Sequence, residues 1–295
     1  MSASNSYIYY SFGFKITSNY EIRGLEKNKN SDFPFIPLLI NLKISLDFDD
    51  IENPYGITKN DNVYILCFKK ITYHITKSSI KVTCNSEELF FSTLFNLPLS
   101  IVMTLNGRLL LHSSSFVHEN TLYPICADKG NGKSTLSAYA LTKGDTFFSD
   151  DTLPLILFND CILAVNSVNY IKLNKDSADS IYNSRYNSYK KNIQGKIYIP
   201  TKYKFYSLPL NHIFFMVTNN KINHIQLISN FSTIKILLFK NIVGISWFDS
   251  SLKNLITESD IFKALYLNSL KFFSFNNSKT FISLNNVYEY IIANK

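Results

Sequence analysis

The segment Ala127-Asp-Lys-Gly-Asn-Gly-Lys-Ser-Thr135 constrains this chain more than any other feature of its sequence. The apolar run 122–126 precedes it and the helix-forming run 136–141 follows it, which gives the order strand, tight loop, helix. In such a loop, glycines let backbone N–H groups turn inward onto phosphate oxygens, and the helix N-terminus adds positive partial charge. The segment therefore predicts a phosphate-binding loop.

The loop matches the pattern G-x-x-x-x-G-K-[ST] except that Ala127 stands at the first glycine position, the strand exit. In this pattern Lys133 reaches the β- and γ-phosphates, and the Ser134 hydroxyl binds Mg²⁺. We expect the other nucleotide contacts from Gly130, Asn131, Gly132 and Thr135. The chain has only 9 glycines, so two of them in one short loop indicate a backbone that must approach phosphate closely. The pattern predicts binding of ATP with Mg²⁺.

Two adjacent carboxylates, Asp150 and Asp151, follow the short apolar strand that we expect at 145–149. One helix and one return strand fill the interval between the loop and this pair. A strand that ends in acid beside such a loop holds Mg²⁺ through one carboxylate. A second carboxylate can then accept a proton from an attacking hydroxyl, which is typical of a kinase. The alternative interpretation is a solvated turn at a strand end.

A single histidine, His112, lies in the apolar run 109–117, which we expect to be a strand beside the strand of the phosphate loop. A lone histidine on an apolar strand is commonly a packed, hydrogen-bonded core residue. Its place beside the loop strand also suits a residue of the site. The residues alone leave both interpretations open.

Together these motifs resemble the catalytic core of the HPr kinase/phosphorylase family, and especially its smaller members, which include lasso-peptide precursor kinases. The resemblance implies that His112 is an active-site histidine, that Asp150 accepts the proton, and that Ser134 and Asp151 bind magnesium. The run Lys196-Ile-Tyr-Ile-Pro200 also resembles the smaller members, which makes Lys196 a candidate for a phosphate or substrate contact.

The resemblance implies a fold like that of PEP carboxykinase and transfer of phosphate to a seryl hydroxyl on a peptide or protein, such as a ribosomal peptide precursor. The family's Glu-Ile-Arg-Gly signature does not follow Asp151, so neither HPr as the substrate nor the phosphorolysis activity is implied. The alternatives are a non-catalytic or regulatory nucleotide-binding protein and a kinase of a small molecule.

Runs rich in β-branched and aromatic residues, separated by turn residues, dominate the first third of the chain. We therefore expect an α/β (α+β) protein with a β-rich N-terminal module, residues 1–100, and a catalytic domain, residues 101–295. The N-terminal runs are 7–16, 63–68, 71–76 and 80–84. In the second part we expect strands at 161–165, 169–173, 196–199 and 211–217, and helices at 174–183, 259–266 and 285–293.

Positive charge gathers late in the chain. No acidic residue lies between Asp179 and Asp249, whereas this stretch holds nine basic ones: Arg185, Lys190, Lys191, Lys196, Lys202, Lys204, Lys221, Lys235 and Lys240. The stretch predicts an anionic partner, either phosphate or an acidic peptide. Only three residues of the chain are arginine, which argues against nucleic acid because arginine is the main tool for bidentate phosphate and guanine contacts.

The remaining features indicate a cytoplasmic protein. The N-terminus lacks the basic and apolar regions of a secretory signal, and polar residues interrupt the apolar stretch 89–111, so we expect no membrane span. The cysteines lack metal-ligand spacing, and we expect reduced, packed thiols at Cys67, Cys84, Cys126 and Cys161. The sequence leaves a homo-oligomer open.

Overall fold

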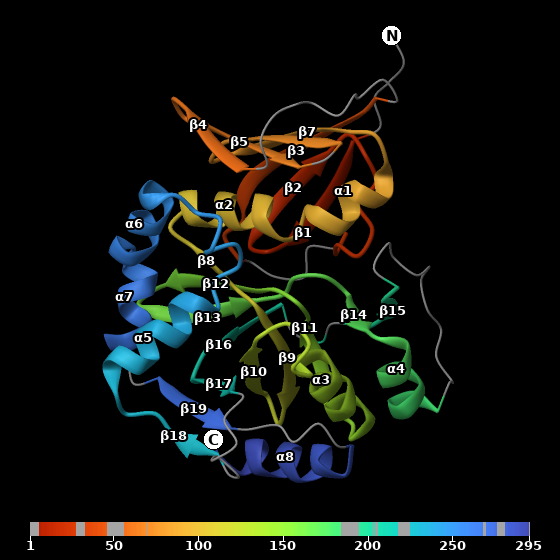
Figure 1. Cartoon of the computed structure of the whole chain (residues 1–295), viewed down its shortest axis with the longest axis vertical. Coiled ribbons are helices and arrows are strands. Elements are labelled where there is room, and N and C mark those ends of the chain that lie inside the picture. The colour runs from red at the N-terminus through yellow and green to blue at the C-terminus, as the bar shows by residue number, and fades with distance from the viewer. Residues whose placement is uncertain are drawn as a thin grey trace.

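A computed structural model gives the structure of the chain and describes residues 6–27, 33–45, 56–68, 70–183, 195–202, 204, 206–217, 225–267, 270–275 and 281–294. Within these residues there are four β-sheets and eight α-helices. The expected mixed α/β class is therefore confirmed. One sheet lies at the end of the molecule that carries the N-terminus, and the other sheets lie below two helices that separate them from it (Figure 1).

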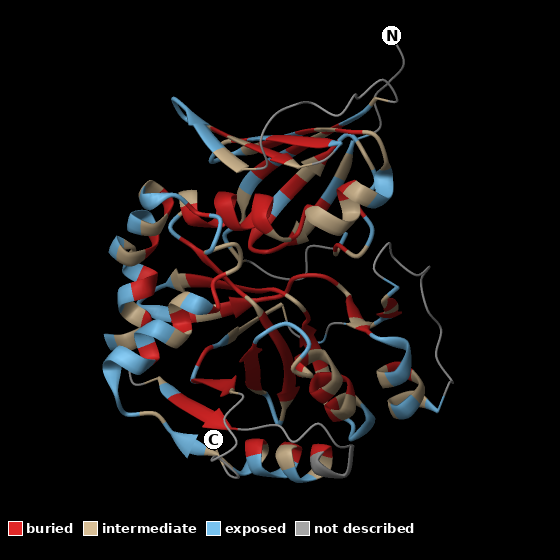
Figure 2. Ribbon diagram, in the orientation of Figure 1, coloured by how far each residue is buried: buried red, intermediate tan, exposed pale blue. Residues whose placement is uncertain are grey.

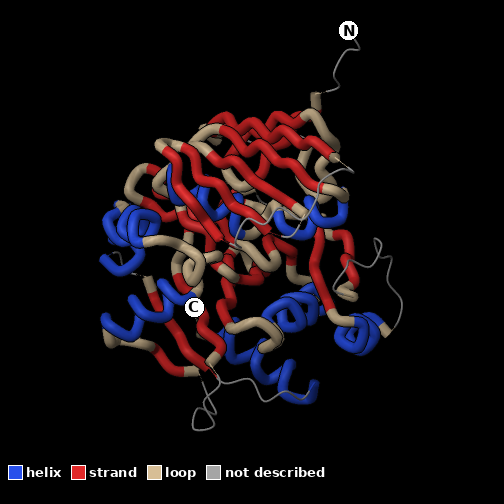
Figure 3. The backbone as a smooth tube through the Cα atoms, turned by 45° about the horizontal axis from the view of Figure 1, so that its top comes forward, coloured by secondary structure: helices blue, strands red, loops and turns tan. Residues whose placement is uncertain are grey.

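The N-terminal sheet has the order β1-β2-β3-β7-β6-β5-β4 in the described residues, and its strands run side by side across the top of the view in Figure 3. The run 7–16 is a hairpin of two strands rather than one, because Gly13, with φ of +75°, turns the chain between them. The other three expected strands are confirmed. The strands are β1 (Tyr7–Ser11), β2 (Phe14–Ser18), β3 (Ile36–Ile44), β4 (Gly56–Asn60), β5 (Val63–Phe68), β6 (Ile71–Ile75) and β7 (Ser79–Cys84).

Two helices that the sequence did not suggest, α1 (Glu87–Thr93) and α2 (Leu97–Leu105), lie under this sheet. Ser86 caps α1 by accepting a hydrogen bond from Leu89 N at 3.3 Å. Helix α2 is buried on every side from Leu97 to Thr104, as expected of a helix that is apolar all round. In the described part of the chain no single helix is long and apolar enough to cross a membrane. Helices α1 and α2 reach that length and apolar character only when taken together, and a bend of 49° separates them.

The sheet that carries the phosphate loop has the order β11-β9-β10-β17-β19-β18. Strands β10, β17 and β19 run parallel to one another. Helix α3 (Lys133–Thr142) and helix α8 (Phe281–Ala293) pack on it, and Leu136 and Tyr288 are buried there with Phe116. The strands are β9 (Ser113–His118), β10 (Thr121–Ala127), β11 (Thr146–Ser149), β17 (His212–Met216), β18 (Gln226–Leu227) and β19 (Lys271–Phe275).

A third sheet, in the order β16-β13-β12-β8, and the pair β14-β15 complete the second part. Helices α5, α6 and α7 flank the third sheet, and α4 lies beside the pair (Figure 1). The strands are β8 (Leu109–Leu111), β12 (Leu153–Phe158), β13 (Cys161–Val165), β14 (Tyr170–Leu173), β15 (Ile197–Pro200) and β16 (Ser207–Pro209). The helices are α4 (Lys175–Tyr182), α5 (Phe231–Lys240), α6 (Ser250–Glu258) and α7 (Asp260–Leu267).

Most of the expected elements of the second part are confirmed: β13, β14, β15 and β17 among the strands, and α4, α7 and α8 among the helices. Helices α5 and α6 were not expected. Local capping explains where they begin. The Asn230 side chain accepts a hydrogen bond from Thr233 N at the start of α5, and the Asp249 side chain accepts one from Leu252 N at the start of α6.

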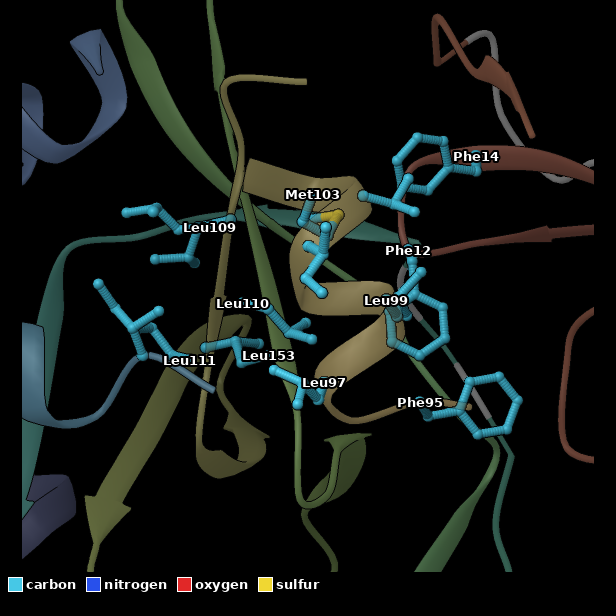
Figure 4. Close-up of a cluster of buried hydrophobic side chains, with 14 of the residues drawn as sticks. Phe12, Phe14, Phe95, Leu97, Leu99, Met103, Leu109, Leu110, Leu111 and Leu153 are labelled. Atoms are coloured by element: carbon cyan, nitrogen blue, oxygen red, sulfur yellow. The ribbon is translucent and has the colours of Figure 1, made fainter. Parts of the chain in front are cut away.

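Helix α2 joins the two parts of the molecule through a common core. Figure 4 shows Phe12 and Phe14 of the N-terminal part on one side of this helix and Leu110 and Leu153 on the other. Figure 2 shows that burial runs without a break from the first sheet through α2 into the strands below it. Residue 100, where we expect the N-terminal module to end, lies inside α2. The division into two modules stays a prediction.

Acid is expected to destabilise the fold through His212, which is 2% exposed between the rings of Tyr123 and Phe214. Burial, together with the nearby Lys271, lowers the pKa of His212 from 6.5 to about 4. Between these two values the unfolded chain binds a proton and the folded chain does not, so stability falls as the pH falls from about 6.5 to 4, by up to about 3 kcal/mol.

Denaturant unfolding of His212→Asn at several pH values measures this contribution. We expect a shallower loss of stability below pH 6.5 than in the wild type, whereas His74→Asn, at an exposed position, keeps the wild-type slope. Equal slopes in the wild type and in His212→Asn would contradict this assignment.

Candidate functional site

The phosphate loop runs from Ala127, the last residue of β10, to Lys133, the first residue of α3. Gly130 and Gly132 have φ of +87° and +91°, the left-handed region that favours glycine. Gly132 is the N-cap of α3, and no side chain caps the first turn, so its N–H groups are not claimed by a cap. Ala127 is a buried strand residue and needs no left-handed backbone, which explains why alanine is tolerated there.

The Lys133 side chain lies under this loop and is only 7% exposed. Its Nζ donates to the carbonyl of Ala127 at 2.7 Å and approaches that of Asp128 at 3.4 Å. Burial lowers the pKa of Lys133, and the carboxylates of Asp151 and Asp150 partly offset this effect. The loop thus holds a cation with little water around it, where its field on a bound anion is strongest.

Asp150 is fully enclosed and bonds to the loop rather than facing open space. Its Oδ1 accepts a hydrogen bond from Ser134 Oγ at 2.7 Å, and its Oδ2 accepts one from the backbone N–H of Lys172 at 2.7 Å. Burial raises the pKa of Asp150, and the neighbouring charge of Asp151 adds to the effect. The side chain is therefore fixed against the loop serine.

Asp151 points the other way, because its backbone has a φ of +66°. Its Oδ2 pairs with Lys172 Nζ at 2.9 Å, and its Oδ1 lies 3.5 Å from His112 Nε2. Burial alone would raise the pKa of Asp151, but Lys172 and His112 outweigh it and hold that pKa well below its usual range. The carboxylate is 29% exposed and stays ionised throughout the physiological range.

His112 lies at the break between β8 and β9, where the chain passes from the third sheet to the sheet of the loop. Its backbone N–H donates to Asn241 O at 2.7 Å. The imidazole is 32% exposed beside Asp151. His112 is therefore no packed core residue, and of the two interpretations open from the sequence the structure favours a place in the site.

Lys172, on β14, is the main site residue that the sequence did not single out. Burial works against its charge, but Asp151 outweighs burial and raises the pKa of Lys172. Its Nζ also lies 5.7 Å from the ring centres of Tyr170 and Tyr198. The sequence does hold a signal for Lys172, which is the one charged residue in the otherwise apolar strand β14. Because burying an unpaired cation is costly, such a lysine indicates an anionic partner nearby.

Most of the groups described above line one pocket of about 700 Å³. Asp150 and Asn131 do not line it. The predicted residues that do line it are His112, Gly130, Gly132, Lys133, Ser134, Thr135, Asp151 and Lys196. Lys129, Lys172 and Lys240 add positive charge, and Lys240 Nζ pairs with Asp128 of the loop at 3.0 Å. Of the other basic residues in the acid-free stretch, Arg185, Lys190, Lys191 and Lys221 lie outside the described residues.

Magnesium with a nucleotide fits these residues. Mg²⁺ takes one or two carboxylates together with substrate phosphates and water. The hydroxyl of Ser134 and the carboxylate of Asp150 are already 2.7 Å apart at the start of α3, and Asp151 adds a second carboxylate at the pocket surface. The donors are hard oxygen atoms beside a loop suited to phosphate, which is the chemistry this cation prefers.

The far side of the pocket is the segment 242–247, which three contacts hold in place. Val243 N donates to Leu110 O at 2.9 Å, and Val243 O accepts a hydrogen bond from Ser100 Oγ at 2.6 Å. Gly244 has a φ of +79°, and a Cβ there would lie 2.4 Å from a methyl carbon of Leu97. Only glycine lets this segment lie so close to α2.

We expect Gly244→Ala to lower the free energy of unfolding by about 2–4 kcal/mol, because it combines backbone strain with an overlap against Leu97. Gly107→Ala is the matched control: the φ there is +66°, but nothing lies within 4 Å of a Cβ, so the cost is about 1–2 kcal/mol. Thermal or denaturant unfolding measures both. Equal losses in the two variants would show that the contact with Leu97 does not matter.

No family model matches the chain, and no curated protein does so. Among solved structures, it is similar to the HPr(Ser) kinase/phosphatase from Coxiella burnetii. The identity is 10%, the match covers 62% of this chain and 88% of that one, and the TM-score is 0.35. A similarity this distant carries neither residues nor activity over to the chain, so the function is argued from the site.

Proposed function

We propose that the chain is an ATP-dependent kinase that transfers the γ-phosphate to a hydroxyl group, that of a serine in a peptide or protein. One observation carries this proposal: a phosphate loop with Lys133 and Ser134 shares a pocket with Asp151 and His112. A loop alone would suit any nucleotide-binding protein. The ionised carboxylate of Asp151 beside the loop supplies a group that can take the proton from an acceptor hydroxyl.

We further propose that the two aspartates act in the order opposite to that implied by the family resemblance. Asp150 is fixed to Ser134, so these two residues would hold the metal. Asp151 faces the pocket, ionised and oriented by Lys172, so it would accept the proton. Mg²⁺, when bound, neutralises charge on the β- and γ-phosphates.

The residues then divide the transfer among them. The Asp151 carboxylate accepts a hydrogen bond from the acceptor hydroxyl, aims its oxygen at the γ-phosphorus, and takes its proton. The new oxygen–phosphorus bond forms as the bond to the bridging oxygen of ADP breaks. Lys133 stabilises the charge on the transferring group. His112, 3.5 Å from Asp151, holds the far side of that carboxylate.

The wider assignment follows the sequence predictions. A cytoplasmic kinase acting on an acidic peptide or protein, such as a ribosomal peptide precursor, fits the lysines at Lys129, Lys196 and Lys240 around the pocket. The lysines nearest the loop would bind the nucleotide phosphates, and the other lysines would bind acidic side chains of the peptide or protein substrate. The proposal is compatible with either a monomer or a homo-oligomer.

The test is label transfer from γ-³²P-ATP with Mg²⁺ to synthetic peptides and to peptides encoded near the gene. We expect labelled phosphoserine with the wild-type chain and a large loss with Lys133→Ala or Asp151→Asn. ATP binding without label transfer to any peptide would instead favour a regulatory nucleotide-binding protein. Transfer to small alcohols alone would favour a small-molecule kinase.

A further inference from the structure

The pocket has two unlike sides. The loop, β14, the residue before β15 and the end of α5 bring lysines to the pocket, whereas its described lining residues at 68, 96, 97 and 242–247 carry no charged side chain. We call this side the neutral wall and define it by Phe68, Asn96, Leu97, Val243, Ile245 and Trp247. The rings of Phe68 and Trp247 meet edge to face, with their centres 6.2 Å apart.

The neutral wall lies at the acceptor end of the site. Lys133 marks the β- and γ-phosphates, and His112 lies beside Asp151, the proposed proton acceptor. The segment that forms much of the wall is bonded to the backbone around His112, where Leu111 pairs with Ile242. The first turn of α3 meets another part of the pocket lining, because Thr135 Oγ1 donates to Ser177 Oγ of α4 at 3.3 Å.

The wall is also firmly built, yet its outer part faces solvent. Gly244 packs against Leu97, and Ser100 fixes the carbonyl of Val243. Trp247 nevertheless remains 50% exposed, and Phe68 is half-buried. Two adjoining aromatic rings that stay partly in water beside a transfer site are suited to stacking on an apolar group that extends out of the pocket.

We propose that the neutral wall binds a bulky apolar side chain next to the phosphorylated serine, so that the acceptor is an extended peptide segment with an apolar residue flanking its hydroxyl. This inference rests on the proposed kinase function and deepens it. The proposal also assigns a function to the N-terminal part of the chain, because Phe68 on β5 and Leu97 on α2 both line the acceptor site. An uncharged wall disfavours an acidic residue at that position.

Trp247 reports on this site directly, because it is the single tryptophan of the chain. The probes are two acetylated, amidated heptapeptides with a central serine. Phenylalanine and leucine flank the serine in the first, and aspartates replace both in the second. Without ATP, we expect only the first peptide to shift Trp247 emission to shorter wavelength. Phe68→Ala should weaken its binding about tenfold.

Phe158→Ala is the matched control, since Phe158 is 39% exposed and does not line the pocket. Trp247→Ala gives a second variant, at a position that is 50% exposed, and calorimetric titration should show the same loss of affinity for the apolar peptide. In the transfer assay, Phe68→Ala should raise KM for the apolar peptide and leave KM for ATP unchanged.

Several outcomes would overturn the proposal. Mg-ATP alone could shift Trp247 emission and compete with the peptide, which would make the wall a nucleobase site. Equal binding of the two peptides, or binding of neither, would also refute it. Binding of the apolar peptide without label transfer would contradict the kinase function and leave the neutral wall as a peptide-binding site. Label transfer at equal rates to both peptides would support the kinase function and contradict the proposed role of the neutral wall.

Discussion

Replacing Lys133 by methionine is expected to reduce label transfer by at least about 10²–10³-fold, the loss seen when one preorganised group that stabilises transition-state charge is removed. Methionine keeps most of the side-chain volume under the loop and removes only the charge. Lys133 as a whole residue is only 7% exposed, so little water screens the action of its charge on a bound phosphate. Single-turnover transfer from γ-³²P-ATP measures the effect.

Folding must be separated from function in this experiment, because Lys133 Nζ also bonds to the carbonyl of Ala127. An unpaired carbonyl costs about 1–3 kcal/mol, while loss of a buried cation whose pKa burial has lowered offsets part of that cost. A melting curve for each variant settles whether the protein remains folded. Lys143→Met, at an exposed position just after the same helix, should keep the wild-type rate.

A folded Lys133→Met protein that transfers label at the wild-type rate would remove the phosphate loop from the proposed mechanism. Retained ATP binding with no transfer would be informative in another way: it would show that the lysine acts on the transferring group and not on ground-state affinity.

The order strand, tight loop, helix around residues 127–135 could be predicted from sequence because its signal is local: glycines, lysine and serine at fixed spacing between an apolar run and a helix-forming run. The different orientations of the Asp150 and Asp151 side chains could not be predicted. Which of two adjacent carboxylates turns toward Ser134 depends on the left-handed backbone at Asp151 and on the N–H of Lys172. Both depend on how distant strands pack, which spacing along the chain does not encode.

The neutral wall was beyond sequence analysis for a related reason. Phe68 on β5, Leu97 on α2 and Trp247 in the segment 242–247 are far apart in the chain, and only the folded structure brings them to one pocket. Helix α2 is buried from Leu97 to Thr104, with Ser100 and Thr104 as its only polar residues over that range, so it lacks the 3.6-residue alternation of apolar and polar residues by which a surface helix is recognised. The same uniform burial that hides the helix in the sequence places it between the two parts of the core.

Replacing each aspartate by asparagine is expected to give two different failures. Asp151→Asn should lower kcat by about 10²–10⁴-fold, the usual contribution of a positioned acid–base group, with the magnesium requirement unchanged. Asp150→Asn should instead raise the Mg²⁺ concentration needed for half-maximal transfer, because Asp150 holds the Ser134 hydroxyl. Asp176→Asn, at an exposed position on α4, controls for a general change in charge.

The pH profile sharpens the distinction. Burial and the charge of Asp151 raise the pKa of Asp150, so acid protonates Asp150 before Asp151, whose pKa is well below its usual range. Since Mg²⁺ binds only the ionised carboxylate, excess Mg²⁺ should displace the acid limb of transfer to lower pH in the wild type. If Asp151 were the metal ligand, the acid limb would not move with Mg²⁺, and Asp151→Asn would be the variant with the altered magnesium requirement.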